Sequence, residues 1–560
     1  MRTQRISRWL LTAVSLAILL PAIGAAGQAA DTALVVAARN GDLQAVRSLI
    51  AGRANVNEHA RDGSTAILWA AYHSNLEMAR ALIAAGAAVN TPNHYGITPL
   101  LQASRSGDAP LIAALLKAGA DAAATHPDGE TPLMAASRTG HVDAVRLLLD
   151  AGANVNAADD AYQQETALMW AAAEGHMDVV KALLAAGADP NRKGHVNALE
   201  DRKHADYTTG GFTALMFAVR NGHEEVAKAL IKGGADPKLT NGDGATATMV
   251  AIVNDRFDLA GELLDLGADA NDGSLYFAVD MHDATTDMRA RDGSRLRANH
   301  PNKLTALALV TLLLDRGADP NKPFVGQLHS TSYCCGDDIN ASPFYRAAVA
   351  SDVEVLKLMI ARGAQVEWSP SEVKKEGRGA GAATAGRGPN IGKTPIMVAM
   401  AGGRGAGIAG GPGFDRIGPP PFREPSNRDP AEALKLLLTA GANANTKAPD
   451  GSTPLHQAVQ ARQVAMIRTL VAAGASLDAT NKDNLTPLQL AEKPEPATPA
   501  APVDPLIFRP KRDTREDVIA ALRELMKLGP NDPTPVPPPL PADPGKKVED
   551  KKEDKKDAQK

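Results

Sequence analysis

Between Glu130 and Asn156 the apolar residues fall into two short runs at close to helical spacing. Thr131-Pro132 precedes the first run, and this pair suits a helix start because Thr can cap a helix and Pro fits its first turn. Gly140 interrupts the pattern. Gly152 ends the second run, since Gly reaches the positive φ of a helix end at low cost. The stretch predicts two helices, each with one buried face, formed by Leu133, Ala135, Ala136, Val142, Val145, Leu147, Leu148 and Leu149.

The same unit recurs along most of the chain. The closing glycine appears at Gly86, Gly119 and Gly152, a spacing of 33 residues, within words such as GAAVN, GANVN and GADPN. The openers that precede it include STAIL, ITPLL, ETPLM, FTALM and STPLH. Further copies of the closing glycine are Gly187, Gly234, Gly267, Gly317, Gly363, Gly441 and Gly474.

A 33-residue period with a T-P-L-H-x-A opener resembles the ankyrin-repeat family over about residues 31 to 526. The resemblance implies an all-α solenoid of about twelve helix–turn–helix units, joined by finger-like hairpins and carrying long insertions. One unit cannot bury its apolar face alone, so neighbouring units must stack to form a continuous core. The resemblance also implies a concave groove, lined by the fingers and the first helices, which is the usual binding surface of the family.

The chain is expected to have five parts in order. They are a signal peptide at 1–30, regular repeats with one insertion (191–211) at 31–273, repeats with long insertions at 274–450, terminal repeats and a cap at 451–526, and a disordered Pro-rich, charged tail at 527–560.

The first thirty residues are interpreted as a targeting segment. Arg2, Arg5 and Arg8 precede the apolar run Trp9–Leu20, and small residues follow, with cleavage expected between about residues 26 and 31. The run is too short for a comfortable membrane span, so we expect no stable span after cleavage. These features predict export to a bacterial periplasm or beyond. An uncleaved anchor is the alternative.

Composition excludes some classes of partner. A net charge of −4 gives no whole-chain attraction to nucleic acid. The two cysteines, Cys334 and Cys335, are adjacent, and their Cα atoms therefore lie about 3.8 Å apart, below the usual disulfide range of about 4.4–6.8 Å. The protein is not built on disulfides, although a strained, redox-active bond is conceivable.

Insertions fall into two groups according to where they interrupt a unit. Those that follow the closing turn should emerge on the finger side, and those between the two helices should emerge at the opposite edge. The finger-side group suggests a crowded wall over the middle of the groove, used for binding, and the alternative is loop drift at little cost. The first group is 191–211, 322–340 and 367–392, and the second is 281–303, 402–428 and 494–510.

The position of a residue within its repeat predicts whether its side chain contacts a neighbouring repeat or a partner. The fifth position from the opening Thr holds Trp69, Trp170 and Phe217. The resemblance to the ankyrin-repeat family implies that this position packs against the neighbouring repeat, so we expect these side chains to belong to the core. The groove is expected to expose Tyr72, Arg105, Arg138 and Arg220, and the finger tips His59, Arg61, His94, Tyr95, His126, Asp128 and Tyr162. Tyr and Arg are favoured at interface hot spots. This mixed rim predicts a protein or peptide partner in the cell envelope, unless the tips are only solvated.

Motifs that resemble catalytic sites depart from their patterns. The loop ending in Gly392-Lys393-Thr394 has Arg387 where a phosphate-binding loop needs Gly, and GAGIAG at 405–410 precedes a Pro-rich stretch that cannot begin a helix. We therefore expect no enzymatic activity and no cofactor. The alternative is a metal-binding or redox-enzyme accessory protein that uses the insertions at 191–211 and 322–340, which carry His195, His329 and the cysteine pair.

Overall fold

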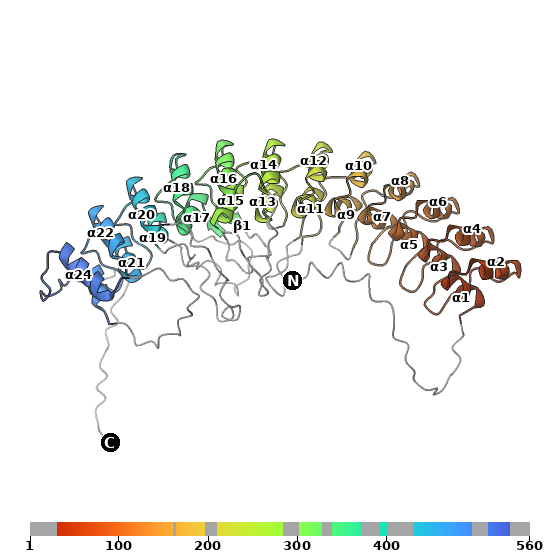
Figure 1. Ribbon diagram of the computed structural model, residues 1–560, viewed down its shortest axis with the longest axis horizontal. Helices are drawn as coiled ribbons and strands as arrows, with labels where there is room; N and C mark the ends of the chain where they lie inside the picture. The colour runs from red at the N-terminus through yellow and green to blue at the C-terminus, as the bar shows by residue number, and fades with distance from the viewer. Residues whose placement is uncertain are drawn as a thin grey trace, which may run out of the picture. The chain divides into compact units, whose positions relative to one another are not determined.

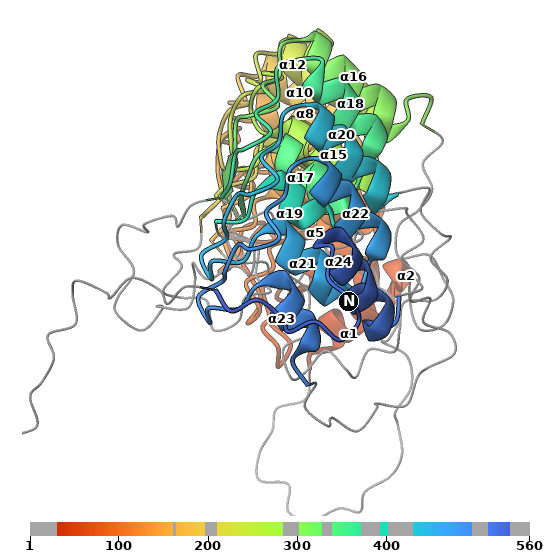
Figure 2. The ribbon, with the colours of Figure 1, turned by 90° about the vertical axis from the view of Figure 1, so that its left-hand side faces the viewer.

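The structure is a computed structural model, and it describes residues 31–160, 164–196, 210–242, 244–283, 302–326, 339–370, 392–400, 429–494 and 513–537. These residues form twelve consecutive helix pairs, as the repeat pattern predicts. In each pair the odd-numbered helix comes first, and Figure 1 shows the odd-numbered and even-numbered helices in two rows. Within each of the two compact units described below, the segments joining one pair to the next lie on one side of the helices (Figure 2).

The first helices are α1 (Ala33–Arg39), α3 (Ala66–Tyr72), α5 (Pro99–Ser106), α7 (Pro132–Thr139), α9 (Ala167–Glu174), α11 (Ala214–Asn221), α13 (Ala247–Val253), α15 (Ser274–Asp283), α17 (Pro343–Ala350), α19 (Pro395–Ala399), α21 (Pro454–Ala461) and α23 (Pro487–Glu492). The second helices are α2 (Leu43–Ala51), α4 (Leu76–Ala84), α6 (Ala109–Lys117), α8 (Val142–Asp150), α10 (Met177–Ala185), α12 (Glu224–Lys232), α14 (Phe257–Asp265), α16 (Ala306–Asp315), α18 (Val353–Ile360), α20 (Pro430–Thr439), α22 (Val464–Ala472) and α24 (Arg515–Leu525). Two short antiparallel strands are β1 (Phe324–Gly326) and β2 (Ile339–Ala341).

Most first helices begin as the openers predict. In α5 the Thr98 hydroxyl accepts the N–H of Leu101 at 3.1 Å, and Pro99 fills the first turn, where no N–H is needed. Second helices often begin at an Asp or Asn cap, such as Asp108, whose carboxylate accepts the N–H of Leu111 at 3.0 Å. These local signals set the helix boundaries before any packing is considered.

The chain divides into two compact units. The first unit runs to Pro127 and includes Asp150–Ala153, and the second contains Asp128–Leu149 and everything from Asn154 onward. In both units small alanines of the first helices and leucines of the second helices form the core. Close approach at alanine explains why so few aromatic residues suffice. Fully buried examples are Ala103 and Leu115 in the first unit, and Ala136, Leu148, Ala172 and Leu183 in the second.

A ladder of asparagines joins successive closing turns. In the first unit the Asn57 side chain donates to the Gly86 carbonyl (3.2 Å) and accepts the Ala88 N–H (2.7 Å). Asn156 makes the equivalent pair of bonds in the second unit. The same ladder position holds Lys238, which cannot accept a hydrogen bond through its side chain. The ladder is therefore interrupted there.

Histidines that follow the mid-repeat turn form a second ladder. Nε2 of His223 lies 3.0 Å from the Ala173 carbonyl, and Nε2 of His176 lies 3.1 Å from the Arg138 carbonyl. The His223 ring packs over Gly175, where a Cβ would lie 2.5 Å from the ring. These histidines therefore belong to the architecture of the repeat.

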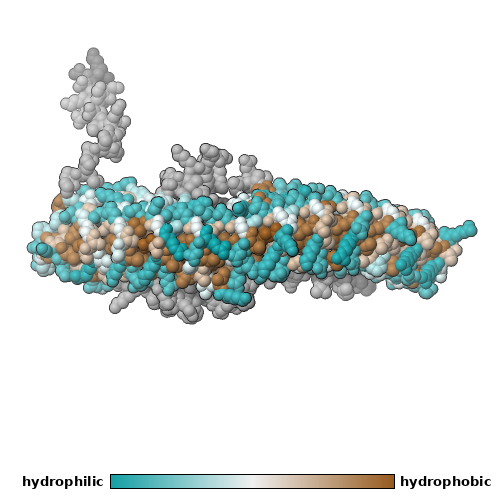
Figure 3. All heavy atoms as spheres, turned by 90° about the horizontal axis from the view of Figure 1, so that it is seen from above, coloured by the Kyte–Doolittle hydropathy of each residue, from teal (hydrophilic) through white to brown (hydrophobic). Residues whose placement is uncertain are grey.

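Charged side chains cover the second helices and link neighbouring pairs. Figure 3, which looks onto this side, shows hydrophilic bands alternating with apolar ones. In the second unit Lys228 of α12 pairs with Glu262 of α14 (3.1 Å), and Arg362 pairs with Asp315 of α16 (2.8 Å). Such exposed pairs each contribute little to stability, about 0–1 kcal/mol.

The attachment points of the insertions agree with the predicted sorting. On the finger side, β1 pairs with β2, the Gly194 N–H donates to the Phe212 carbonyl (2.9 Å), and the Gly392 N–H donates to the Pro370 carbonyl (3.0 Å). These three hairpin stems carry the insertions predicted at 322–340, 191–211 and 367–392. The other three insertions join the first and second helices of a pair. Beyond these attachment points, most residues of the insertions lie outside the described part of the chain.

Candidate functional site

In the first unit the end of α3, where a groove residue is predicted, carries an aromatic cluster. Tyr72, at the end of the helix, is 60% exposed, and its ring meets Trp69 edge-on with centroids 5.5 Å apart. The Arg39 guanidinium, from the preceding repeat, lies over the half-buried Trp69 ring at 5.3 Å and pairs with Asp31. Trp69 therefore packs against its neighbouring repeat, as predicted, while most of Tyr72 is left to solvent.

Turn chemistry explains why a tyrosine can stand at the tip of the second finger. In the first finger Asp62 closes the turn by accepting the Ser64 N–H at 2.9 Å. In the second finger Asn93 takes this role, because its side-chain oxygen accepts the N–H groups of Tyr95 (3.1 Å) and Ile97 (2.9 Å). The side chain of Tyr95 is thus not needed for the turn, and it is 66% exposed.

The fingers of the first unit are joined by their backbones. The His94 N–H donates to the Asp62 carbonyl at 2.8 Å. The His94 ring packs so closely on Gly63 that a Cβ there would lie 2.7 Å from the ring, and Gly63 also needs φ of +77°. Both features hold the exposed tips in fixed positions, which reduces the entropy that a partner must overcome on binding.

The remaining predicted contacts of the first unit have structural roles as well. His59 Nδ1 lies 3.3 Å from the Gly63 carbonyl, and the Arg61 N–H donates to Asp31 at 3.1 Å. Arg105 lies in the last turn of α5, and His126 lies beside Gly96 of the preceding finger. The structure therefore places the predicted residues of this unit on three fingers and two first helices. Tyr72 and Tyr95 are its most exposed aromatic residues.

In the second unit the groove arginines stack on aromatic rings. Arg138 lies over Trp170 (5.7 Å) and within 3.4 Å of Glu130, and Arg220 lies over Phe212 (5.4 Å) and Phe217 (4.9 Å). Phe217 is buried, with 9% exposure, as the register predicts. Stacking holds each guanidinium in one orientation while leaving N–H donors for a partner.

One groove residue was missed by the motif analysis. Glu165, directly before the opener of α9, is partly buried, and this burial, with Asp159 adding to it and Arg220 opposing, raises its pKa to about 7. Glu130 holds the same place before α7. An acidic residue before the opening Thr was therefore the available signal.

Two predicted finger-tip residues, Asp128 and Tyr162, belong to the second unit. Asp128 closes its turn by accepting the Glu130 N–H at 3.1 Å, and its carbonyl accepts the Asp160 N–H at 3.0 Å. Its carboxylate therefore stabilises the turn of its own finger. Tyr162 lies outside the described residues.

The repeats that carry long insertions have a different groove face. Phe324 of β1 is 5% exposed and packs edge-on against Phe277 of α15, with centroids 4.8 Å apart. Trp368 of the next finger meets Tyr345 of α17 edge-on at 5.5 Å. Here the fingers cover the first helices with their own aromatic side chains, which the sequence analysis did not predict.

Polar pairs lie beside these covered helices. Arg346 Nε donates to Asp280 at 2.6 Å, and His282 Nδ1 lies 2.5 Å from a carboxylate oxygen of Asp352, the cap of α18. Asp280 occupies the register position that Arg138 and Arg220 hold in other repeats. The groove position is thus used for an internal ion pair in this region.

The candidate metal and nucleotide motifs find little support in geometry. His195 lies in a finger stem, where its carbonyl accepts the Gly211 N–H, while His329, Cys334 and Cys335 lie outside the described residues. Within the described ranges no three His, Cys, Asp or Glu side chains are grouped so as to hold a metal ion. Thr394 begins α19 as an ordinary repeat opener. Nor does any helix among these residues have the length and apolar character needed to cross a bilayer.

Comparison with known families agrees with this geometry. The family described as "Ankyrin repeats (3 copies)" matches residues 34–126, 100–194 and 195–274, and "Ankyrin repeats (many copies)" matches residues 437–491, together more than half of the chain. The chain belongs to the ankyrin-repeat family. Ankyrin repeats generally mediate protein–protein interactions, and proteins of this family are typically non-enzymatic scaffolds.

Individual relatives match only parts of this ankyrin-repeat protein. The human "SH3 and multiple ankyrin repeat domains protein 2" is 42% identical over 60 residues, which are 11% of this chain and 3% of the relative. The crystal structure of the human ASB11 ankyrin repeat domain shares 30% sequence identity and a TM-score of 0.34, covering 39% of this chain and 91% of that one. The chain therefore spans only a small part of the curated relative.

Proposed function

We propose that this protein binds a protein or peptide partner through the groove and finger tips of its regular repeats. The observation that carries the proposal is the pair Tyr72 and Tyr95, which are 60% and 66% exposed on rigid elements. Large exposed aromatic rings lose little conformational entropy on binding and bury much apolar area. The stacked Arg138 and Arg220 add oriented hydrogen-bond donors in the second unit.

The partner is proposed to be polypeptide and not nucleic acid. Near the exposed tyrosines, Arg39 is neutralised by Asp31, and Glu130 lies beside Arg138 in the second unit. A nucleic-acid surface needs an excess of basic side chains to contact phosphates. Balanced charge with exposed aromatics is typical of protein interfaces, where Tyr and Arg are the commonest hot-spot residues.

We further propose that the protein is exported and meets its partner in the cell envelope or outside the cell. The support is the order of residues in the first thirty, with Arg2, Arg5 and Arg8 before the apolar run and small residues after it. N-terminal sequencing of the protein purified from a periplasmic or culture fraction should give a start between about residues 26 and 31. Intact protein beginning at Met1 in the membrane fraction would contradict cleavage.

Affinity capture with the full-length chain tests the binding proposal. Wild-type protein is compared with the double variant Tyr72→Ala/Tyr95→Ala and with Arg80→Ala, a matched control on the second-helix face of the same unit, where Arg80 is 60% exposed. A protein that is retained by the wild type and by Arg80→Ala but lost by the double variant supports the groove. Equal retention by all three contradicts the proposal.

A further inference from the structure

The described part of the chain continues beyond α24, the last helix. Residues 527–537, here named the C-terminal strap, follow α24 and lie on the last helix pair, although the sequence analysis assigned them to the tail. Residues 538–560 lie outside the described part. The strap is thus a separate feature of the second unit, apart from the groove of the regular repeats.

The strap begins with the same backbone turn that closes a repeat. Lys527 takes the positive-φ position that Gly474 holds one repeat earlier, with φ of 59° against 90°. In both turns this residue donates to the carbonyl three residues back, and the next N–H donates to the carbonyl five residues back. The bonds are Lys527 to Glu524 (3.0 Å) and Leu528 to Arg523 (2.9 Å) in the strap, and Gly474 to Val471 (3.0 Å) and Ala475 to Leu470 (2.9 Å) in the earlier turn.

By this register the strap is the first part of a twelfth finger, the one that follows the twelfth helix pair. The Asp532 N–H donates to the Gly529 carbonyl at 3.2 Å, as Thr446 N–H donates to Asn443 after the closing Gly441. No T-P-L-type opener follows in the sequence, which continues as PPLPADPGKKVEDKKEDKKDAQK. Residues 538–560 therefore contain no opener at which a further helix pair would begin.

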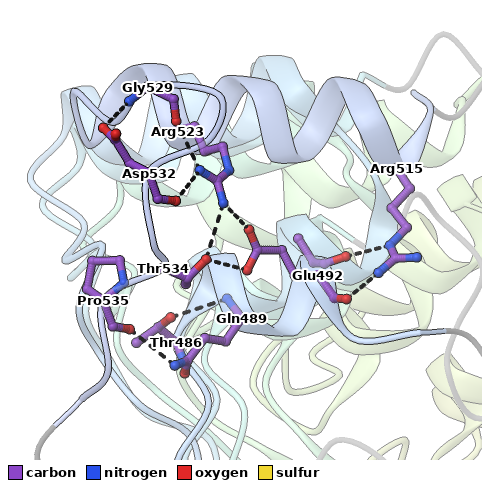
Figure 4. A network of polar contacts seen from close by, with 10 residues as sticks. Thr486, Gln489, Glu492, Arg515, Arg523, Gly529, Asp532, Thr534 and Pro535 are labelled. Carbon is purple, nitrogen blue, oxygen red and sulfur yellow. Dashed lines mark hydrogen bonds and ion pairs between the residues drawn. The ribbon is translucent and has the colours of Figure 1, made fainter.

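Arg523 of α24 clamps the start of the strap (Figure 4). Its side chain is only 15% exposed, and it donates to the carbonyls of Gly529 (3.0 Å) and Asp532 (2.9 Å). The same guanidinium donates to Glu492 of α23 at 2.7 Å. Charge-assisted bonds of this kind are stronger than neutral ones, so one side chain ties the strap to both helices of the last pair.

The strap then runs along α23, the first helix of the last pair. The Thr534 hydroxyl donates to the second carboxylate oxygen of Glu492 at 2.6 Å, and the Gln489 side chain donates to the Pro535 carbonyl at 3.2 Å (Figure 4). In the regular repeats the corresponding side of a first helix is covered by the next finger and the next first helix. Here the strap takes that place.

Prolines keep the strap from pairing with the preceding finger in the way that other fingers do. Where fingers pair, an N–H at the tip donates to the preceding finger, as Lys482 N–H does to the Asp450 carbonyl at 3.0 Å. The residue of the strap in register with Lys482 is Pro535, which has no N–H. Pro530, Pro533 and Pro537 likewise have no N–H to donate, and the strap is held instead by side chains of the last helix pair, such as Arg523 and Gln489.

We infer that the strap terminates the array by covering an end surface that would otherwise receive the first helix pair of a second copy of this chain. The end of one repeat stack is complementary to the beginning of another, because both are built like the interfaces between repeats. At the beginning of the stack, Val36 of α1 is 39% exposed. Contact of this head-to-tail type does not close on itself and would give open chains of molecules.

The test uses the full-length protein with two changes and one matched control. In the first, Arg523→Ala removes the clamp. In the second, residues 529–537 are replaced by a Gly/Ser sequence of equal length. The control, Arg468→Ala, removes an exposed ion pair between α22 and α24 that does not touch the strap. Hydrogen exchange of the α23 amides and sedimentation velocity over a range of concentrations are the two measurements.

We expect at least tenfold faster exchange in α23 for Arg523→Ala and for the replacement, and less than twofold change for Arg468→Ala. The replacement should also give species larger than the monomer, whose fraction rises with concentration. Unchanged exchange in both strap variants overturns the clamp. A replacement variant that stays monomeric at every concentration overturns termination of the array, even if its exchange is faster.

Discussion

The finger of the second repeat and the finger that contains β1 use an aromatic side chain in opposite ways. Tyr95 in the first unit is 66% exposed, whereas Phe324 in the second unit is 5% exposed and packs on Phe277. In the first case the backbone and Asn93 complete the turn, so the side chain is available. In the second case the hairpin folds its side chain onto the helix beneath. One type of hairpin can therefore present a surface or cover it.

The charged groove positions show the same difference. Arg39 in the first unit stacks on Trp69 and has a 38% exposed side chain. Asp280, which holds this register position in one of the inserted repeats, has a 22% exposed side chain and is bonded to Arg346. Regular repeats thus keep their polar groups accessible to a partner, while the inserted repeats use them to hold neighbouring helices together.

The largest expected effect separates the two aromatic residues. Phe324→Ala should destabilise the helices around α15 by about 3–5 kcal/mol, because a buried ring is lost and leaves a cavity. Tyr95→Ala should change stability by less than about 0.5 kcal/mol, since the ring is mostly exposed. Hydrogen exchange in α15 and α5 reports each local stability. Equal losses in the two variants would remove the distinction between covered and exposed fingers.

A smaller loss is expected for the internal ion pair. Asp280→Ala leaves Arg346 partly buried without this carboxylate, and the cost should be about 2 kcal/mol, below the range for fully buried pairs because both groups retain some exposure. Asp31→Ala removes the ion-pair partner of the more exposed Arg39 and the acceptor of the Arg61 N–H, and it should have a smaller effect on stability. Thermal unfolding of both variants would show whether burial makes this difference.

The asparagine ladder allows one variant that should lose stability to be compared with one that should gain stability. Asn156→Ala removes two hydrogen bonds to the next closing turn and should cost about 1–2 kcal/mol. Lys238→Asn restores the missing step and should add about 0.5–1 kcal/mol. Denaturant unfolding monitored by circular dichroism can measure both changes. A destabilised Lys238→Asn protein would show that the ladder is not the limiting contact there.

The smallest effect concerns pH. The folded-state pKa of Glu165 is about 7, above the value of 4.5 for a free carboxyl, so the folded state holds this proton more tightly. Its contribution to stability is therefore greatest below about pH 4.5 and is lost as pH rises through 7. Glu165→Gln should match the wild type near pH 4 and exceed it by about 1 kcal/mol at pH 8. A parallel pH profile for the two proteins would contradict the assigned pKa.

Local sequence signals were enough for the helix pairs. Thr98-Pro99 and Asp108 determine where two helices begin, and each closing glycine determines where a second helix ends. The 33-residue register also placed Trp69 against its neighbouring repeat and Phe217 in a buried position. These features depend on residues within one unit or in adjacent ones, which a repeat makes visible.

Long-range contacts could not be predicted in the same way. Phe324 meets Phe277 across a hairpin of irregular length, and Arg346 meets Asp280 across an insertion between helices. The strap was assigned to the tail because its Pro-rich composition is typical of disorder, yet Arg523 binds two of its carbonyls. Composition carries no information about a single side chain that reaches back from the preceding helix.

Site-specific photo-crosslinking tests the central claim most directly. A benzophenone amino acid is placed at position 72, at position 95 or, on the second-helix face of the same unit, at position 80 of the full-length chain. If the groove of the regular repeats is the binding surface, positions 72 and 95 should crosslink to the same polypeptide and position 80 should not. Crosslinks from position 80 alone, or from all three positions equally, would contradict it.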